Sequence, residues 1–486
     1  MEIAMNYKLV FHILGLILRV EAVLMLPAAV IGMVTGGGDG SAFLLSAGIT
    51  MAAGQVLTML PGKNMKMQAR DGFAAVALSW MVLSLFGALP YVFSGVLPNY
   101  VDAVFETASG LTTTGATVFT AIEGSPLGVL FWRAQTQWMG GVGVLVMALA
   151  LVPKLGEGSV FLMRAESPGP IKSKLTPRIG DTAKILYSIY IGLTAAETLC
   201  LRLAGMPWYD AVIHSFTTIS TGGFSVKNAS IAAYNSLTIE WIIIVFMFLS
   251  GINFALLFFA VRRNFTAVFQ SEELHSYTIM IAAASSLIVL NLVVHAGWAL
   301  NLRTVTDSVF QVVTLMTTTG YMTSDYVLWP TFSQVILVLV MFAGGCAGST
   351  AGGIKQIRVL LLVKNLRREV QRILHPRVVT TLRSDGERVE EATLSGITLF
   401  FFAYILLLLM GTLAVAWDDV GFTAAFTASL TCISNVGPAF DVLGPTSNFF
   451  ALSNVSKVVL SLEMLLGRLE IMPLLLLLFP SLWKKR

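Results

Sequence analysis

The string VDAVFETASGLTTTGATVF, at residues 101–119, has three counterparts in the same chain. They are YDAVIHSFTTISTGGFSV at 209–226, TDSVFQVVTLMTTTGYMTS at 306–324 and GFTAAFTASLTCISNVGPAF at 421–440. Each contains hydroxyl residues followed by a glycine, and the aligned glycines are 108, 97 and 117 residues apart. Four such strings between apolar stretches predict a fourfold internal repeat.

Aligning the strings on the glycine places four triplets at the same position. These glycine triplets are Thr113-Thr114-Gly115, Thr221-Gly222-Gly223, Thr318-Thr319-Gly320 and Asn435-Val436-Gly437. Asp102, Asp210 and Asp307 each stand 13 residues before the glycine, whereas the fourth repeat has Ala424 there. Because Asp is a favoured N-cap residue, the spacing predicts a helix of about three turns and a short loop before each glycine.

The composition around these strings excludes an ordinary soluble enzyme. Of 486 residues, 56% are apolar and 12% are charged, about half the charged fraction of a soluble protein. Apolar runs long enough to cross a bilayer lie near 72–97, 184–205, 237–261, 276–300, 394–417 and 452–479. The chain is therefore predicted to be an all-α polytopic membrane protein. Its three cysteines, far apart in apolar stretches, fit neither disulfides nor a metal site.

Charge predicts the orientation of the spans. Of the 31 Lys and Arg residues, 25 fall in six segments: the N-terminal region, 63–70, 154–184, 262–263, 355–388 and the C-terminus. By the positive-inside rule these segments share the cytoplasmic face. The chain must then cross and return between them, giving ten spans with both termini inside, and Tyr7–Val34 is a retained first span rather than a signal peptide. Connections on the other side are rich in Asp and Glu, which would attract cations there.

The repeat divides the chain into an N-terminal extension of two helices and four units of span, short helix and span. The expected boundaries are 1–62 for the extension, 63–180 for unit 1 (filter 112–116), 181–270 for unit 2 (filter 220–224), 271–391 for unit 3 (filter 317–321) and 392–486 for unit 4 (filter 434–438).

The short segments before the glycines cannot cross a bilayer, so they are predicted to be four re-entrant pore helices. Irregular backbone at membrane depth is tolerated only where it is buried in protein or lines a water-filled path, which favours one central pore. The negative ends of the short helices would then favour a cation, and backbone carbonyls would replace its hydration shell. Glycine permits the extended strand to line a narrow passage.

The stretch MFAGGCAGSTAGGIKQIR at 341–358 interrupts the second span of unit 3. Each glycine in a helix interior costs about 1 kcal/mol relative to alanine, so a flexible break is expected within 343–353. Close helix packing through small residues is the alternative. A phosphate-binding loop is a poor alternative, because the GxxxxGK[ST] pattern is absent.

Arg468 is a lone cation in the apolar stretch VVLSLEMLLGRLEIMPLLLLLF. A charge at that depth is costly and indicates either function or an ion pair with another helix. Glu463 and Glu470 do not share its helical face. The sequence assigns no role to Lys457, or to Arg133 in FWRAQTQWMGG.

Three classes of function compete on these residues. A cation pore is favoured by four uncharged triplets. A potassium–proton or potassium–sodium symporter would need an ionisable site at mid-membrane, and Glu197 and Glu463 are isolated candidates. An enzyme is disfavoured because the five histidines form no metal spacing and no nucleophile motif is present. A net charge of +4 gives no reason to expect nucleic acid as a partner.

Taken together, SGLTTTGAT, STGGFS, TTTGYM, SNVGP, GGCAGSTAGGIK and LLGRLE resemble the Trk/Ktr/HKT superfamily of potassium transporters, and within it the bacterial TrkH type. The resemblance covers nearly the whole chain. It implies potassium uptake across the inner membrane, with a glycine in all four filters favouring potassium over sodium. It also implies a gate below the filter, formed by Arg468 and by Gly344, Gly345, Cys346, Ala347, Gly348, Ser349, Thr350, Ala351, Gly352 and Gly353.

The basic stretch 355–391 faces the cytoplasm in this prediction. It would bind anionic lipid head groups or a regulatory protein. The resemblance favours the second reading and implies a homodimer with cytosolic TrkA-type subunits that bind NAD and ATP. Potassium is then the substrate, no cofactor belongs to this chain, and any nucleotide sits on the partner.

Overall fold

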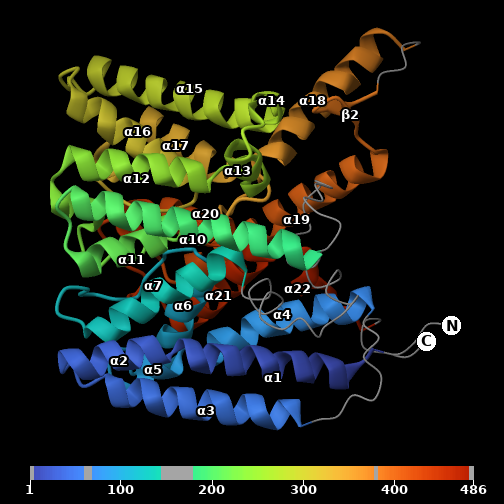
Figure 1. Ribbon diagram of the computed structural model, residues 1–486. Helices are drawn as coiled ribbons and strands as arrows, with labels where there is room; N and C mark the ends of the chain where they lie inside the picture. Colours follow the sequence, from blue (N-terminus) through green and yellow to red (C-terminus); the bar gives the residue numbers. More distant parts are fainter. Residues whose placement is uncertain (1–4, 60–67, 144–178, 377–380, 481–486) are drawn as a thin grey trace.

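The computed structural model describes residues 5–59, 68–143, 179–376 and 381–480, and the regular secondary structure of these residues is almost entirely helical. Residues 144–178, which hold most of the basic segment 154–184, lie outside this part, as does the basic C-terminus. The helices run side by side in one general direction (Figure 1). The two β-strands, β1 (Arg383–Ser384) and β2 (Glu387–Arg388), form a small antiparallel hairpin.

The helices follow in chain order. The first group is α1 (Tyr7–Leu24), α2 (Leu26–Thr35), α3 (Gly40–Thr58), α4 (Ala69–Phe86), α5 (Leu89–Phe93), α6 (Tyr100–Leu111) and α7 (Leu127–Val142). The second is α10 (Ile179–Leu203), α11 (Trp208–Ile219), α12 (Leu237–Ser250), α13 (Phe254–Val261) and α14 (Phe265–Phe269). The third is α15 (Glu272–Val294), α16 (Leu302–Met316), α17 (Thr331–Ala343) and α18 (Gln356–Leu374). The last is α19 (Glu391–Ala416), α20 (Phe422–Ser434), α21 (Asn454–Arg468) and α22 (Met472–Leu477).

Six helical segments of the described chain are long and apolar enough to cross a bilayer. They are Tyr7–Thr35, Gly40–Thr58, Arg70–Phe93, Ala183–Leu203, Glu272–Val294 and Glu391–Ala416, and the bent pair α12 and α13 makes a seventh if it is counted as one span. This agrees with a polytopic helical protein. These segments include the expected first span, and the apolar runs that begin near 72, 184, 276 and 394 also lie on them.

Two other apolar runs are not the continuous spans expected from the sequence. The run 237–261 bends by 103° between α12 and α13. The run 452–479 breaks after α21, where Glu470 and Ile471 have φ values of 53° and 68°. The glycine-rich stretch does interrupt a helix as predicted, because α17 ends before Gly344, whose φ is 68°. Hydropathy averaged over each run did not predict the first two breaks, although Gly251 and Asn253 lie at the first and Glu470 and Pro473 at the second.

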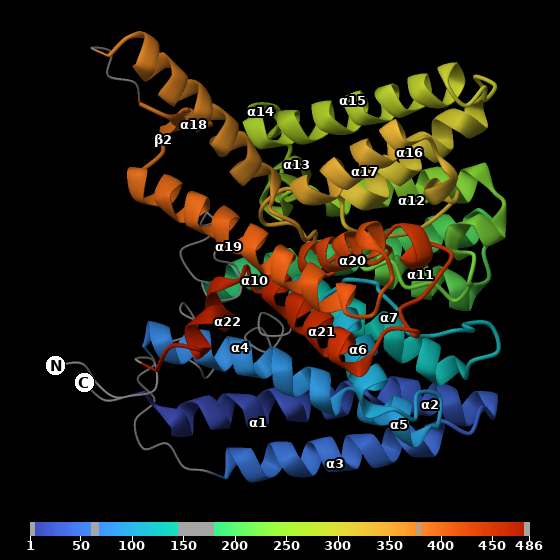
Figure 2. The same cartoon turned by 180° about the vertical axis from the view of Figure 1, so that it is seen from behind.

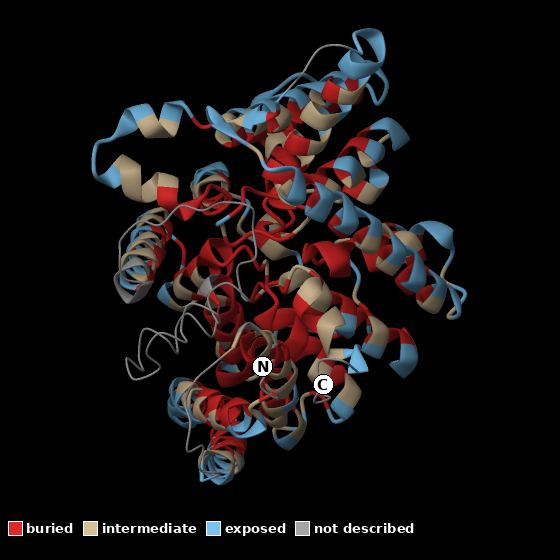
Figure 3. Ribbon diagram, turned by 90° about the vertical axis from the view of Figure 1, so that its right-hand side faces the viewer, coloured by how far each residue is buried: buried red, intermediate tan, exposed pale blue. Residues whose placement is uncertain are grey.

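Buried residues lie in the middle of the molecule and exposed ones around its rim (Figure 3). The rim is nevertheless apolar: Leu199, Ile279, Leu290 and Leu413 are among many large hydrophobic side chains more than half exposed. An apolar surface of this extent indicates contact with lipid. The short helices α6, α11, α16 and α20 lie among the longer ones (Figure 2). Their buried residues include several serines and threonines.

Candidate functional site

The helices α6, α11, α16 and α20 each end in a turn of the same type. In each, the first residue of the glycine triplet has a left-handed backbone, with φ of 56° at Thr113, 56° at Thr221, 58° at Thr318 and 57° at Asn435. The N–H of the next residue then donates to the carbonyl five positions back, at distances of 2.7–2.9 Å. This is the Schellman arrangement, which satisfies carbonyls at a helix end. The helices span 12 to 15 residues, as the aspartate spacing predicts.

Threonine is an unusual residue at such a position. The left-handed region crowds the Cβ of a β-branched side chain, and holding one there costs on the order of 1–3 kcal/mol. Three of the four turns carry this cost at Thr113, Thr221 and Thr318. Strain repeated at equivalent places points to a functional constraint on the backbone.

The four glycine triplets meet and form a closed ring. A Cβ added at Gly115 would collide with the carbonyl oxygen of Gly222, and one at Gly223 with that of Thr319. A Cβ at Gly320 would likewise meet the carbonyl oxygen of Val436, and one at Gly437 that of Thr114. Each triplet therefore places the carbonyl of its middle residue against the glycine of a neighbouring triplet. A side chain at any of these glycines would have no room.

A cavity of about 270 Å³ lies on one side of the ring. Gly115, Gly223, Gly320 and Gly437 all line it, and the other lining residues include Ala116, Thr117, Phe224, Ser225 and Asn448. We call it the triplet cavity. The triplet glycines give it uncharged backbone, and its lining among the described residues contains Arg133 and Lys227 but no Asp or Glu. It is therefore suited to partial dehydration of a cation by backbone oxygens rather than to tight binding by carboxylates.

The glycine-rich loop 344–354 packs against the other side of the ring. The N–H of Gly352 donates to Thr318 Oγ1 at 2.7 Å, and the N–H of Gly353 donates to Ser434 O at 2.8 Å. Thr350 Oγ1 lies 3.1 Å from the Ile219 carbonyl oxygen, at the end of α11. The loop thus contacts the ends of three of the four short helices.

Arg468, at the end of α21, connects this loop to the fourth short helix, α6. Its guanidinium donates to Thr113 Oγ1 at 3.2 Å and to the Thr350 carbonyl at 2.8 Å. It also donates to the carbonyls of Gly140 and Gly141, at 2.5 and 2.8 Å, where α7 ends. A cation at a helix C-terminus interacts favourably with the negative end of the helix dipole. The structure therefore brings the two predicted parts of the gate, Arg468 and the loop, together beneath the ring.

The aspartates at the start of the short helices are not the N-caps that the sequence indicated. Asn99 and Asn301 cap α6 and α16, and Pro207 precedes α11. Asp102 and Asp307 instead lie within the helices and make ion pairs. Arg303 pairs with Asp307 at 2.8 Å, in the i,i+4 geometry. The periodic spacing was correct, but the aspartates act through side-chain partners that a local pattern does not contain.

These ion pairs also change the expectation that Asp and Glu residues in the outer connections attract cations. Asp102, Glu106 and Asp307 are buried, and each is paired, so they add little field at an entrance. Exposed acids of that group include Glu123 and Asp419.

Lys457 and Arg133, to which the sequence assigned no role, both hold α6 in place. Lys457 Nζ donates to Asp102 Oδ1 at 2.6 Å, and both side chains are buried. Arg133 Nε donates to Glu106 Oε1 at 2.8 Å. The Arg133 guanidinium also lies over Phe119 and Phe224, 4.6 and 4.0 Å from the ring centroids. Opposite charges in two separate apolar stretches were the signal available in the sequence.

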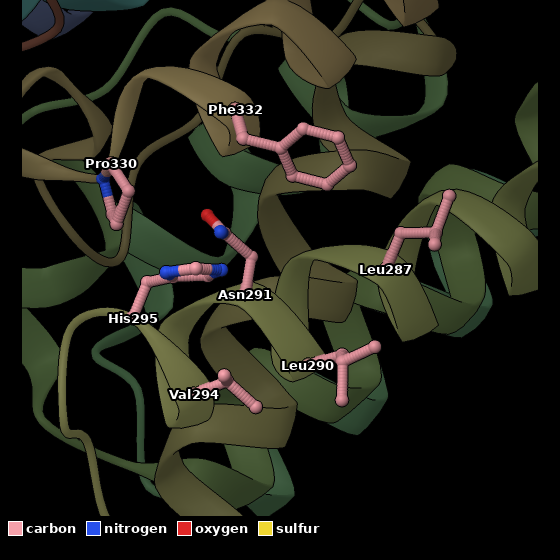
Figure 4. Close-up of a pocket in the computed structure, with 7 residues that line it drawn as sticks. All are labelled: Leu287, Leu290, Asn291, Val294, His295, Pro330 and Phe332. Carbon is pink, nitrogen blue, oxygen red and sulfur yellow. The ribbon is translucent and has the colours of Figure 1, made fainter.

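Glu197 and Glu463 are not brought together: Glu463 accepts from Ser429 on α20, and Glu197 is buried on α10. Among the described residues no group of His, Cys, Asp and Glu is arranged to hold a metal ion. A larger hollow of about 530 Å³ lies between α15 and α17, lined mainly by apolar side chains with Asn291 and His295 (Figure 4). It contains no residue of the ring or loop, so it is separate from this site.

The fold and site define a polytopic membrane protein with a fourfold uncharged constriction. Residues 39–485 match the TrkH family, described as cation transport proteins. The chain is 40% identical to "Trk system potassium uptake protein TrkH" of Halomonas elongata, over 99% of this chain and all of the relative. It is 38% identical to the protein of the same name in Escherichia coli, over 99% of this chain and 100% of that protein.

Among solved structures, the chain is similar to the crystal structure of "the Potassium Transporter TrkH from Vibrio parahaemolyticus". The TM-score is 0.87 at 34% identity, covering 99% of this chain and 100% of that one. The chain therefore belongs to the TrkH family of cation transport proteins, and it is a transporter rather than an enzyme.

Proposed function

We propose that this protein takes up potassium across the bacterial inner membrane through a gated pore. The ring of glycine triplets carries this proposal, because four middle carbonyls approach four glycines at one central constriction. The names of the relatives support potassium as the transported ion.

The ring suits a monovalent cation for physical reasons. The carbonyl ends of four short helices point their partial negative charge toward one place. Neutral carbonyl oxygens replace the hydration shell while holding the ion weakly enough for release. Potassium is thus the substrate of the site, and no resident cofactor is proposed for this chain.

The proposed architecture is ten spans and four re-entrant pore helices, α6, α11, α16 and α20, with both termini in the cytoplasm. The unit boundaries are those expected from the repeat: 1–62, 63–180, 181–270, 271–391 and 392–486. In this arrangement α7 belongs to the second span of unit 1. The second spans of the other units are α12 with α13, α17 with α18, and α21 with α22, each with a break between its two helices. The equivalent turns at the four triplets support the fourfold division.

The gate is proposed to be the loop 343–353 together with Arg468. The loop covers three short-helix ends, and the Arg468 cation lies against the fourth. A fixed positive charge below a neutral constriction opposes passage of a cation. Conduction then requires the loop and the arginine to leave the axis together.

Regulation by cytosolic TrkA-type subunits, and assembly as a homodimer, complete the proposal. Helix α18 follows directly from the loop and projects from the body of the molecule (Figures 1 and 2). It exposes Val363, Leu366, Val370 and Ile373, at 45 to 79%. This helical spacing makes an apolar stripe that suits a protein partner better than lipid head groups.

Reconstitution in liposomes tests the function. A potassium gradient alone should drive flux, unchanged by an added pH or sodium gradient. Obligatory dependence on a second gradient would instead indicate symport, which neither the family description nor the names of these relatives favour.

A further inference from the structure

The four glycine triplets differ at their middle residue. Thr114 and Thr319 each place a hydroxyl against that of a neighbouring threonine, 2.7 and 2.8 Å from Thr112 and Thr317. The second triplet has Gly222 there and so has no side chain to fill this place. Something else must support its backbone.

Gln137 of α7 fills the space that a side chain at Gly222 would need. A Cβ added at Gly222 would collide with the carboxamide group of Gln137. Gln137 Nε2 donates to the Gly222 carbonyl at 2.6 Å, and Gln137 Oε1 accepts from the N–H of Phe224 at 3.1 Å. One fully buried side chain therefore bonds the backbone on both sides of Gly223.

The orientation of this amide follows from its partners. A backbone carbonyl can only accept and a backbone N–H can only donate, so the NH₂ must face Gly222 and the oxygen must face Phe224. In the flipped orientation both hydrogen bonds would be lost. The pair of contacts is therefore specific to glutamine.

Helix α7 holds Gln137 in a fixed position. One turn earlier on the same helix, Arg133 pairs with Glu106 on α6 and donates to the Ser225 carbonyl at 3.3 Å. One turn later, Gly140 packs so closely on Leu111 of α6 that a Cβ there would collide with its carbonyl. Contacts with α6 on both sides of Gln137 therefore fix the position of this side chain.

We propose that Gln137 is a positioning residue for ion selectivity, acting through the Gly222 carbonyl. This inference rests on the proposed function, because it assigns that carbonyl to the ion path. The Gly222 oxygen is one of the four that form the ring, and it alone lies in a triplet with no side chain at its middle position. Held by Gln137, it cannot move inward to contact a smaller ion. Without Gln137 the ring can contract around sodium.

The test compares permeability to potassium and sodium in proteoliposomes. Gln137→Met, which preserves volume but removes both bonds, should lower the potassium-to-sodium permeability ratio about tenfold, or ~1.4 kcal/mol. Gln137→Glu keeps the acceptor for Phe224 but loses the donor to Gly222, so it should lower the ratio too. Gln135→Met, a change of the same chemistry on the same helix, is the control and should leave the ratio unchanged.

A double variant distinguishes positioning from general structural damage. Gly222→Thr with Gln137→Ala gives the second triplet the threonine of the first and third, and it should recover at least half of the lost selectivity. Full selectivity in a monodisperse Gln137→Met protein would overturn the inference. If Gln137→Met does not fold, unchanged selectivity in Gln137→Glu overturns it instead.

A binding measurement separates this inference from the proposed function. If the unaltered protein shows no potassium-driven flux, the proposed function fails. The midpoint of thermal unfolding of the purified full-length protein, measured in potassium and in sodium, then tests the inference about Gln137. Gln137→Met should lose the difference between the two ions that the unaltered protein shows. Retention of that difference, or its absence from the unaltered protein, would contradict the inference.

Discussion

The guanidinium of Arg468 donates a hydrogen bond of 3.2 Å to the hydroxyl of Thr113, a residue 355 positions earlier in the chain. Thr113 is the strained first residue of its glycine triplet, and the same guanidinium holds the carbonyl of Thr350 in the glycine-rich loop. One side chain therefore links the constriction to the segment that covers it. Its removal should affect both.

Neutralising Arg468 should raise flux. Arg468→Gln removes the positive charge below the ring and weakens the contact with the loop, and a barrier lowered by ~1.4 kcal/mol corresponds to about tenfold faster passage. Rubidium uptake into proteoliposomes measures this. Arg468→Lys keeps the charge and should stay within about twofold of the unaltered protein; equal uptake by the glutamine variant would refute the barrier.

A bulky residue at Gly352 should raise the open probability. An added Cβ would meet the carbonyl of Ser434 at the end of α20, so Gly352→Val prevents the loop from seating. Single-channel recording should show longer openings. Gly396→Val is the control, because a Cβ at Gly396 on α19 has no heavy atom within 4 Å. An open probability like that of the unaltered protein would argue against the loop as gate. A bulky residue at Gly345, where a Cβ would meet that of Ala351, should act in the same direction.

A side chain at a triplet glycine should reduce discrimination between cations. Gly320→Ser adds a Cβ where the Val436 carbonyl lies and therefore widens or distorts the ring. The potassium-to-sodium permeability ratio, obtained from reversal potentials, should fall at least tenfold. Gly192→Ser on α10, where a Cβ meets nothing within 4 Å, should not change it. Equal potassium-to-sodium permeability ratios in both variants would show that the ring does not determine selectivity.

Removing one partner of the Arg133–Glu106 pair should destabilise the protein. Both side chains are buried, so Arg133→Met leaves an uncompensated carboxylate. Such a loss typically costs about 3–5 kcal/mol. Thermal unfolding in detergent should show a lower midpoint, which the double variant Arg133→Met, Glu106→Gln should largely restore. Additive effects of the two changes would mean that the pair is not coupled.

The sequence predicted the repeat and the short helices because both rest on local patterns. Hydroxyl residues before a glycine recur at the ends of α6, α11, α16 and α20, and the apolar runs mark most of the spans. The cluster of glycines likewise predicted the break after α17.

Other features depend on contacts between distant parts of the chain, so the sequence could not supply them. The size of the 103° bend after Ser250 is one such feature: Ser250, Gly251 and the N-cap Asn253 mark a helix boundary there, but not the direction that the next helix takes. Lys457 and Arg133 find their partners on α6. The left-handed threonines run against local preference and are held only because the ring fixes the backbone on both sides.

Anomalous diffraction from crystals of this protein grown in rubidium tests the central claim most directly. An ion peak is expected on the axis of the ring, at the level of the carbonyl oxygens of Thr114, Gly222, Thr319 and Val436, and this peak should be lost in Gly320→Ser. A strong peak elsewhere in the membrane region, with none among these four carbonyls, would contradict it.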